Sequence, residues 1–555
     1  MPVTVAERRL AVRARFPVWN ARTLDQALDH AAQAYPERPF VVTDTLSWTY
    51  AQVVRRSQRI AGALRDLSVG PGDHVALVLA NFPDFVAIKY AISRVGATCV
   101  PINFLNRRDE LGYVLRQSDA SLLIAMDLFR DLDYLKMLDE LAPGWELGGG
   151  GAAFPGLRKV VVFPASGACV REGATPFSAL TEGAANFAGF PDADPHAVSD
   201  IIYTSGTTGA PKGVMLTHDM LLRAAFGSVY GRAFDDAWRV VFSLPMYHVY
   251  GYVEGLLTVP FVGGAIVPQL QFSPAATLDA IETQGADDVL LVPTMTQMVL
   301  DEQRARPRPL ETLRAVISSG QRSPAGIWSE IFELLHPAEV TTGYGMTEVT
   351  ATTTLTQPDD AHARLSTNGR LRDERLVDYR LVDPDTGRVC EAGEIGELMA
   401  KGPGVTAGYY KNPEATAQAF DKDGWFHTGD LGRFDAQGYL SLVGRLKESY
   451  RCGGEQVLPS EIEDVLTSHP AVIQAHVVPV PDRKMGEAGA AFVVLRATPA
   501  VTPDELMRLC AERLARFKAP KYVLPIAAED LPTTPSGRAR KFLLTQRAVE
   551  QLGLS

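Results

Sequence analysis

Short apolar runs alternate with amphipathic segments as far as about residue 440. Residues 75–79, 122–124, 160–163 and 289–292 are continuous apolar runs, which are typical of strands buried on both faces. Residues 51–64 space their apolar side chains as an amphipathic helix does. Because such strands and helices alternate along the chain, the pattern predicts layered α/β structure with largely parallel sheets.

The order of elements changes near the end of the chain. We expect a helix at 461–468, strands at 475–480 and 490–495, and a second helix at 503–516. This order fits a small α+β domain. Since 555 residues are too many for one core, the sequence predicts an N-terminal domain at 1–444, a linker at 445–448 and a C-terminal domain at 449–555.

Composition narrows the class of protein. Apolar residues make up 46% and charged residues 21%, an ordinary globular balance. The net charge of −11 argues against a nucleic-acid binder and against tight docking on anionic membranes. The first residues lack the apolar core of a secretory signal, and no apolar run is long enough to span a bilayer. Five cysteines without metal-ligand spacing are expected to be reduced thiols of a cytoplasmic protein.

A loop rich in glycine and hydroxyl groups follows the apolar run at 198–202. Residues 203–213 read Tyr-Thr-Ser-Gly-Thr-Thr-Gly-Ala-Pro-Lys-Gly. Glycines let backbone N–H groups approach an anion, and hydroxyls and an ammonium add further donors, so the loop suits a nucleotide polyphosphate. It is not a Walker A loop, because Pro211 precedes Lys212 where that motif requires glycine.

The loop resembles the signature of adenylate-forming enzymes, the superfamily of acyl-CoA synthetases, peptide-synthetase adenylation domains and firefly-type luciferases. Further segments match that family in order: Gly-Tyr-Gly-Met-Thr-Glu at 343–348, Trp-Phe-His-Thr-Gly-Asp-Leu at 425–431, Gly-Arg-Leu-Lys at 444–447, and Gly-Gly-Glu-Gln-Val-Leu-Pro-Ser-Glu-Ile at 453–462. The resemblance runs from about residue 49 to residue 544. It implies a large N-terminal domain of layered α/β subdomains and a small mobile α+β lid.

The resemblance also implies a reaction. A carboxylic acid and ATP, with Mg²⁺, form an acyl-AMP, and coenzyme A then takes the acyl group as a thioester. Most of the catalysis should be positioning and electrostatic stabilisation of the carboxylate, α-phosphate and pyrophosphate. The expected partners are therefore a small carboxylic acid or its adenylate and coenzyme A.

Residues in the matched motifs take roles from the family. Glu348 is expected to bind Mg²⁺ and Thr347 to donate to the α-phosphate, while Asp430 accepts from the ribose hydroxyls with help from Arg445. Tyr344 is expected to face the adenine. The full nucleotide set is Thr204, Ser205, Gly206, Thr207, Thr208, Lys212, Gly320, Gln321, Arg322, Gly343, Tyr344, Gly345, Met346, Thr347, Asp430 and Arg445.

The segment Pro-Met-Tyr-His-Val-Tyr-Gly at 245–251 resembles the one whose histidine lies between carboxylate and phosphate. His248 is thus the candidate at the reacting centre, and Glu254 could trim the acyl pocket or bond a polar group of the acid. Gly453 and Gly454 match the loop beside the pantetheine arm, and Lys447 matches the hinge. The expected acyl pocket comprises Tyr247, Tyr250, Glu254, Gly320, Gly343 and Val349.

Two segments depart from the family. The last motif ends in Gly-Lys in relatives, but here Arg538 takes the place of the lysine, and Lys541 corresponds to a separate basic position. An arginine presents a wide planar fork where a lysine presents a compact charge. In the segment lining adenine, Gln321 and Arg322 stand where relatives have small residues.

These departures leave several hypotheses open. The leading one is an acyl-CoA ligase whose adenylation step is weak or lost at Arg538, so that it accepts acyl-AMP made by a separate adenylating ligase. The second is an ordinary two-step ATP-dependent acyl-CoA synthetase. Others are transfer to the phosphopantetheine of a carrier protein, and a non-catalytic relative that only binds AMP or acyl-AMP.

Overall fold

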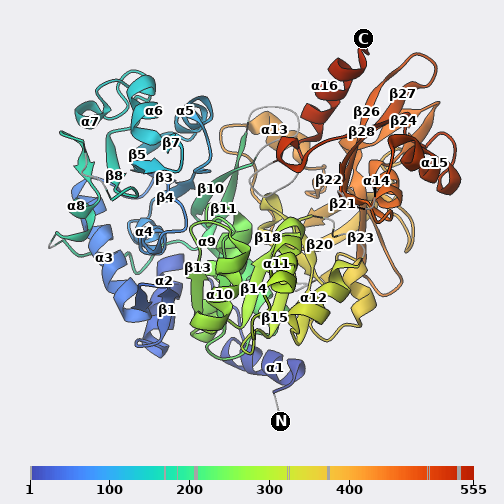
Figure 1. Cartoon of the computed structure of the whole chain (residues 1–555). Coiled ribbons are helices and arrows are strands. Elements are labelled where there is room, and N and C mark those ends of the chain that lie inside the picture. The colour runs from blue at the N-terminus through green and yellow to red at the C-terminus, as the bar shows by residue number, and fades with distance from the viewer. Residues whose placement is uncertain are drawn as a thin grey trace.

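The computed structural model describes residues 3–167, 171–183, 185–204, 211–321, 323, 326–371, 376–496, 498, 500–533 and 539–554. Within these residues the N-terminal part is built on two seven-stranded sheets (Figure 1). The first has the order β16 (Glu339–Thr341), β15 (Ala315–Ser318), β14 (Asp288–Leu291), β12 (Arg239–Phe242), β13 (Ala265–Pro268), β1 (Pro39–Val42) and β2 (Ser47–Thr49). The second has the order β11 (Lys212–Thr217), β10 (Val198–Thr204), β4 (Thr98–Pro101), β3 (His74–Val78), β5 (Ala120–Met126), β8 (Lys159–Phe163) and β9 (Thr175–Pro176).

Both sheets are parallel except at one edge each. β2 pairs antiparallel with β1, and β11 pairs antiparallel with β10. Every residue of β5 is buried, as expected for a parallel strand covered on both faces. The prediction of α/β layers with largely parallel sheets is therefore confirmed.

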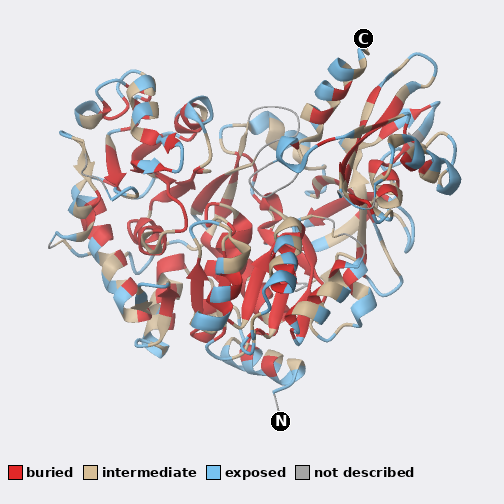
Figure 2. Cartoon of the chain, in the orientation of Figure 1, coloured by how far each residue is buried: buried red, intermediate tan, exposed pale blue. Residues whose placement is uncertain are grey.

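Helices cover these sheets and leave their polar faces to solvent (Figure 2). The 51–64 segment forms α3 (Tyr50–Asp66), which begins at a capping box between Thr49 and Gln52. The other helices before the C-terminal part are α1 (Val5–Arg15), α2 (Leu24–Ala34), α4 (Pro83–Arg94), α5 (Arg108–Gln117), α6 (Tyr134–Leu141), α7 (Trp145–Gly148), α8 (Ser178–Thr181), α9 (His218–Gly231), α10 (Pro274–Gln284), α11 (Pro293–Ala305), α12 (Ile327–Leu335) and α13 (Pro413–Ala419).

Smaller antiparallel sheets follow the first two. One is β17 (Gly343–Met346), β18 (Ala351–Leu355) and β19 (Arg370–Leu371). The next is β20 (Asp378–Val382), β21 (Gly396–Lys401), β22 (Phe426–Phe434) and β23 (Leu440–Arg445). These sheets carry most of the motifs at 343–348 and 425–431 and the first two residues of the motif at 444–447.

The C-terminal residues form a separate sheet with helices on both faces (Figure 1). Its strands are β25 (Glu455–Val457), β24 (Tyr450–Cys452), β27 (Gly486–Leu495) and β26 (Val472–Asp482), with β28 (Tyr522–Pro525) parallel to β27. Val477 packs in the cluster with α14 (Pro459–Thr467) and α15 (Pro503–Arg513), whereas its neighbour Val478 packs with α16 (Lys541–Leu552). Alternate residues thus supply two small cores, one on each face.

Two bulk expectations can be compared with the described residues. None of the helices is long and apolar enough to cross a membrane. Cys99, Cys390, Cys452 and Cys510 are free thiols, and Cys169 lies outside the described residues.

Candidate active site

The motif residues lie on separate elements that touch one another. Lys212 begins β11, Thr347 and Glu348 occupy a 3₁₀ turn, η3 (Thr347–Val349), between β17 and β18, and Asp430 and Arg445 face each other on β22 and β23. His248 lies two residues before a π-helical turn, η1 (Tyr250–Leu256). Wide turns of this kind occur often at functional sites.

Glu348 is buried beside a tyrosine that the sequence did not indicate. The hydroxyl of Tyr409 donates to Oε1 of Glu348 over 3.1 Å. Burial raises the pKa of Glu348 above that of an exposed glutamate, and the tyrosine hydrogen bond opposes this shift. The ring of Tyr409 also lies 4.8 Å below the ammonium of Lys212. Tyr409 therefore joins Lys212, near the end of the 203–213 loop (the phosphate loop), to the Glu348 turn.

The Glu348 turn is held in an unusual backbone conformation. Thr350 and Ala351 have φ of 57° and 73°, where side chains other than glycine are strained. The strands beside the turn are close together. A Cβ on Gly345 would lie 1.8 Å from the carbonyl oxygen of Ala351, and a Cβ on Gly343 would lie 2.2 Å from the carbonyl oxygen of Thr354. Glycine at 343 and 345 is therefore required by the packing.

Asp430 is a buried carboxylate with two protein partners. Nε of Arg445 lies 2.8 Å from Oδ1, and the hydroxyl of Tyr344 donates to Oδ2 over 2.7 Å. The pair is set by the register of β22 against β23, which places residues 430 and 445 opposite each other. An anchored carboxylate of this kind suits a ligand that presents two hydroxyls, and the remaining lone pairs of Asp430 can accept from them.

His248 has a defined tautomer. Its Nδ1 accepts the N–H of Tyr250 over 3.2 Å, so the ring proton sits on Nε2. Burial lowers the pKa of His248 to about 4. At neutral pH the side chain is therefore an uncharged donor through Nε2.

The expected acyl-pocket residues fall into two neighbouring groups. The hydroxyl of Tyr250 donates to the carbonyl of Leu291 over 3.0 Å, and a Cβ on Gly320 would lie 4.0 Å from the ring of Tyr250. Tyr247 packs edge-on against Phe104, with ring centres 5.3 Å apart, and its buried hydroxyl has no hydrogen-bond partner among the described residues. Next to Gly320, Ser319 donates to the carbonyl of Gly343 over 2.7 Å, and Val349 is fully buried.

Glu254 has a more buried setting than a pocket wall implies. It is 0% exposed. One oxygen accepts from the hydroxyl of Ser228 and lies 3.8 Å from Nη1 of Arg232, and the other accepts the N–H of Thr352 over 3.2 Å. Direct contact between Glu254 and the acid stays a prediction.

The C-terminal motif forms a tight hairpin turn between β24 and β25. Gly453 and Gly454 have φ of 62° and 89°, and a Cβ on Gly453 would lie 2.5 Å from the methyl group of Met485. No atom lies within 4 Å of the corresponding position on Gly454, so one side of this turn is open. That opening is compatible with a narrow pantetheine arm.

The linker has one exposed residue between two ion pairs. Lys447 is exposed and makes no ion pair with another described residue. Arg445 is held by Asp430, and Glu448 pairs with Lys541 at 3.2 Å. Lys541 also pairs with Glu463 at 2.8 Å, so it joins Glu448, the last residue of the predicted linker, to helix α14.

Several predicted residues cannot be placed. Ser205, Gly206, Thr207, Thr208, Arg322 and Arg538 lie outside the described residues. Thr204 and Lys212 are paired in the β10–β11 ladder, so the ends of the phosphate loop are adjacent. Gln321 is half-buried beside Gly320.

The donor set agrees with Mg²⁺ held mainly by a nucleotide. Mg²⁺ usually keeps several waters and binds one or two carboxylates together with substrate phosphates. Glu348 would supply one such carboxylate. Within the described ranges, no group of three His, Cys, Asp or Glu side chains could hold a metal ion by itself.

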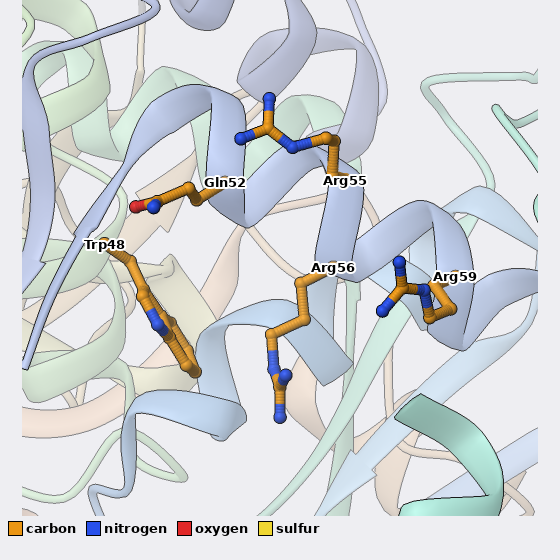
Figure 3. Close-up of a pocket in the computed structure, with 5 residues that line it drawn as sticks. All are labelled: Trp48, Gln52, Arg55, Arg56 and Arg59. Carbon is orange, nitrogen blue, oxygen red and sulfur yellow. The ribbon is translucent and has the colours of Figure 1, made fainter. Parts of the chain in front are cut away.

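The surface also has two hollows of about 220 Å³ each. One is lined by Trp48 and by Gln52, Arg55, Arg56 and Arg59 of α3 (Figure 3). Arg56 is already bonded to Asp84 and stacked on Trp48. The other lies beside the linker and is lined by Pro384, Asp385, Leu446, Ser449, Tyr450, Arg451 and Glu487.

Comparison with known proteins identifies the family. The sequence model described as AMP-binding enzyme matches residues 28–410, and that of the AMP-binding enzyme C-terminal domain matches residues 461–538. The chain belongs to the AMP-binding enzymes. It is an acyl-CoA ligase of the adenylate-forming superfamily, as the sequence motifs predict.

Individual relatives align over most of the chain. A feruloyl-CoA synthase of Amycolatopsis sp is 33% identical over 89% of this chain and 92% of its own. The mitochondrial medium-chain acyl-CoA ligase ACSF2 of Danio rerio is 29% identical over 96% of this chain and 90% of its own. Among solved structures, the o-succinylbenzoate coenzyme A synthetase of Bacillus subtilis in complex with ATP and magnesium ion has a TM-score of 0.77 and 27% identity, and covers 93% of this chain and 98% of that one.

Proposed function

We propose that this acyl-CoA ligase forms its thioester from an acyl-adenylate, with an adenylation step weakened by Arg538. Two observations carry the proposal: the sequence has an arginine at the last-motif position, and the Gly453–Gly454 turn has an open side. The leading half-reaction is then the attack of the coenzyme A thiol on the acyl carbonyl. The thiol gives up its proton to water, the C–S bond forms, the bond from the carbonyl carbon to the phosphate oxygen breaks, and AMP leaves.

The chain's own residues have separate roles in this proposal. Neutral His248 donates from Nε2 to an oxygen at the junction of acyl group and phosphate, and Asp430 accepts from the ribose. Glu348 and Thr347 face the phosphates, where Mg²⁺ would neutralise charge that builds up when pyrophosphate departs. Tyr344, whose hydroxyl is bound to Asp430, lies beside the ribose and adenine. The relative solved with ATP and magnesium supports this assignment of the nucleotide site.

The remaining assignments are part of the same proposal. Tyr247, Tyr250, Gly320, Gly343 and Val349 line the acyl pocket, and their aromatic rings favour an apolar or ring-containing acid. Lys447 is the hinge, Lys212 with the 205–208 loop binds phosphate, and Gly453 with Gly454 accommodates coenzyme A. We place the enzyme in the cytoplasm. The free thiols of Cys99, Cys390, Cys452 and Cys510 support that location.

One set of observations favours the second candidate, an ordinary two-step synthetase. Glu348 accepts from Tyr409 and Asp430 pairs with Arg445, and these anchored carboxylates support a site that carries out adenylation. The two candidates differ in how fast pyrophosphate forms.

The test compares the half-reactions. Acid, ATP and Mg²⁺ are supplied and pyrophosphate is measured; synthetic acyl-AMP and coenzyme A are supplied separately and the thioester is measured by mass spectrometry over a panel of acids. We expect fast thioester formation from acyl-AMP and slow pyrophosphate release. Arg538→Lys should raise pyrophosphate release, by up to about 10²-fold, whereas the neighbouring Arg540→Lys should not.

Each outcome has a distinct meaning. Pyrophosphate release as fast as thioester formation in the unaltered enzyme would leave the ordinary two-step ligase. Acylation of a carrier protein in place of coenzyme A would redirect the second step. No turnover of acyl-AMP with any thiol would refute the catalytic proposal.

A further inference from the structure

Glu254 is a buried carboxylate to which the ligation chemistry above assigns no step. Its side chain joins three elements: its own helix η1, helix α9 through Ser228, and strand β18 through the N–H of Thr352. Arg232, at the end of α9, lies 3.8 Å from the same oxygen that accepts from Ser228. A fully buried carboxylate with a cation and two donors is a satisfied junction.

Two of these elements lead directly to the reacting centre. Helix η1 begins two residues after His248. Strand β18 begins three residues after Glu348, and the intervening path passes through the strained residues Thr350 and Ala351. The β17–β18 pairing is irregular at this point, with a register shift between Tyr344 and Gly345. The turn therefore depends on contacts outside its own ladder.

We propose that Glu254 is a positioning residue that holds the strained turn carrying Thr347 and Glu348 against the segment carrying His248. The proposal rests on the proposed function, because those three residues matter only if the site handles an acyl-adenylate. Glu254 acts through the turn and does not touch the reacting atoms.

The chemistry of the side chain explains why it is a glutamate. An ionised carboxylate accepts at both oxygens, as the bonds to Thr352 and Ser228 require. A glutamine at 254 has one oxygen and one NH₂ group, so it would set a donor against the N–H of Thr352, or it would turn its NH₂ group toward Arg232 and toward a Ser228 hydroxyl that already accepts from Arg232. Glutamine has nearly the same shape as glutamate, but its side chain cannot accept hydrogen bonds at both of its terminal atoms.

Asp288 provides a matched control. It is also buried and bonded to Arg232, and it accepts from Nε1 of Trp238 over 3.2 Å. No hydrogen bond or ion pair links its side chain to β18 among the described residues. Asp288→Asn therefore disturbs the same arginine without disturbing the turn.

The first measurement is independent of catalysis. Hydrogen exchange is followed in the peptide spanning 347–355 of the full chain. In Glu254→Gln this peptide should exchange roughly tenfold faster, as loss of one charge-assisted hydrogen bond implies, with the C-terminal domain unchanged. Asp288→Asn should leave the 347–355 peptide as in the unaltered protein.

The second measurement is calorimetric binding of ATP at a series of Mg²⁺ concentrations. Glu254→Gln should raise the Mg²⁺ concentration needed for half-maximal binding by about tenfold, the lower end of what residues supporting a metal ligand give. Its preference among acyl-AMPs with coenzyme A should stay the same. Ser228→Ala, which removes one donor and keeps the charge, should move both measurements in the same direction by a smaller factor and serves if Glu254→Gln does not fold.

Unchanged exchange in the 347–355 peptide of Glu254→Gln would overturn the proposal. An altered acid preference with unchanged Mg²⁺ dependence would also overturn it, and would make Glu254 a wall of the acyl pocket. Failure of the proposed function shows separately, as an unaltered enzyme that makes no thioester from acid or acyl-AMP. The exchange measurement still decides whether Glu254 holds the turn in that case.

Discussion

Replacing Tyr409 with phenylalanine should shift the pH at which Mg²⁺ acts on this enzyme. The hydroxyl of Tyr409 donates to Oε1 of Glu348 over 3.1 Å, and it opposes the burial that raises the pKa of that carboxyl. Phenylalanine keeps the ring 4.8 Å below Lys212, so the substitution removes only the hydroxyl.

The size of the shift follows from the strength of the lost bond. A hydrogen bond to a charged group contributes about 1.5–3 kcal/mol, so its loss disfavours the ionised form of Glu348 by roughly ten- to hundredfold. The pKa of Glu348 should therefore rise further in Tyr409→Phe. The proposed Mg²⁺ ligand is the ionised carboxylate, so as the pH is lowered the variant should lose Mg²⁺ affinity at a higher pH than the unaltered enzyme does.

Stability should change with pH in the matching sense. A carboxyl whose pKa is raised on folding holds its proton more tightly in the folded state, so its contribution is largest at acid pH and falls as pH rises through the folded pKa. Loss of the hydroxyl raises the folded pKa further, so the total fall in stability becomes larger. Tyr409→Phe should therefore be close to the unaltered protein at acid pH and clearly less stable at neutral pH.

The assay is calorimetric binding of ATP with Mg²⁺ from mildly acidic to mildly alkaline pH, with urea unfolding at the same pH values. Tyr410→Phe is the matched control, because the adjacent hydroxyl donates to Asp119 over 2.9 Å and does not reach Glu348. An identical pH midpoint for Tyr409→Phe and the unaltered enzyme would refute the assigned role of the hydroxyl.

Three further predictions concern other parts of the site. Gly454→Ala should cost only about 1–2 kcal/mol of backbone strain, since the φ of Gly454 is 89° and no atom lies within 4 Å of the added Cβ. The variant should nevertheless form the thioester from acyl-AMP more slowly. An unchanged KM for coenzyme A would contradict a role of Gly454 beside pantetheine. His248, with a pKa of about 4, should show no ring titration near neutral pH by NMR, and a limb of the pH–rate profile that disappears in His248→Asn at neutral pH would contradict its neutral state. Asp430→Asn leaves the largely buried Arg445 without its carboxylate, so urea unfolding should show a loss of about 1–3 kcal/mol and the KM for ATP should rise, whereas Tyr344→Phe removes only a neutral donor and should cost less.

The sequence by itself determined the family, the layered α/β class and most of the element positions. Each of these depends on information that is local in the chain. The apolar runs at 122–124 and 160–163 lie in strands β5 and β8, because a short run of consecutive apolar side chains favours a strand that is buried on both faces. The glycines at 343 and 345 belong to a short contiguous motif, so they can be identified without knowledge of the fold.

Only the tertiary structure decided how the site is held together. Tyr409 is 61 residues from Glu348, and Glu254 is 26 residues from Ser228 and 98 from Thr352, so no spacing in the sequence connects them. Glu254 shows the difference most clearly, because a glutamate beside an expected acyl pocket reads as a substrate contact until its partners are known. Hydrogen bonds between distant segments form only when packing brings both groups out of water together, and that pairing is a property of the whole fold.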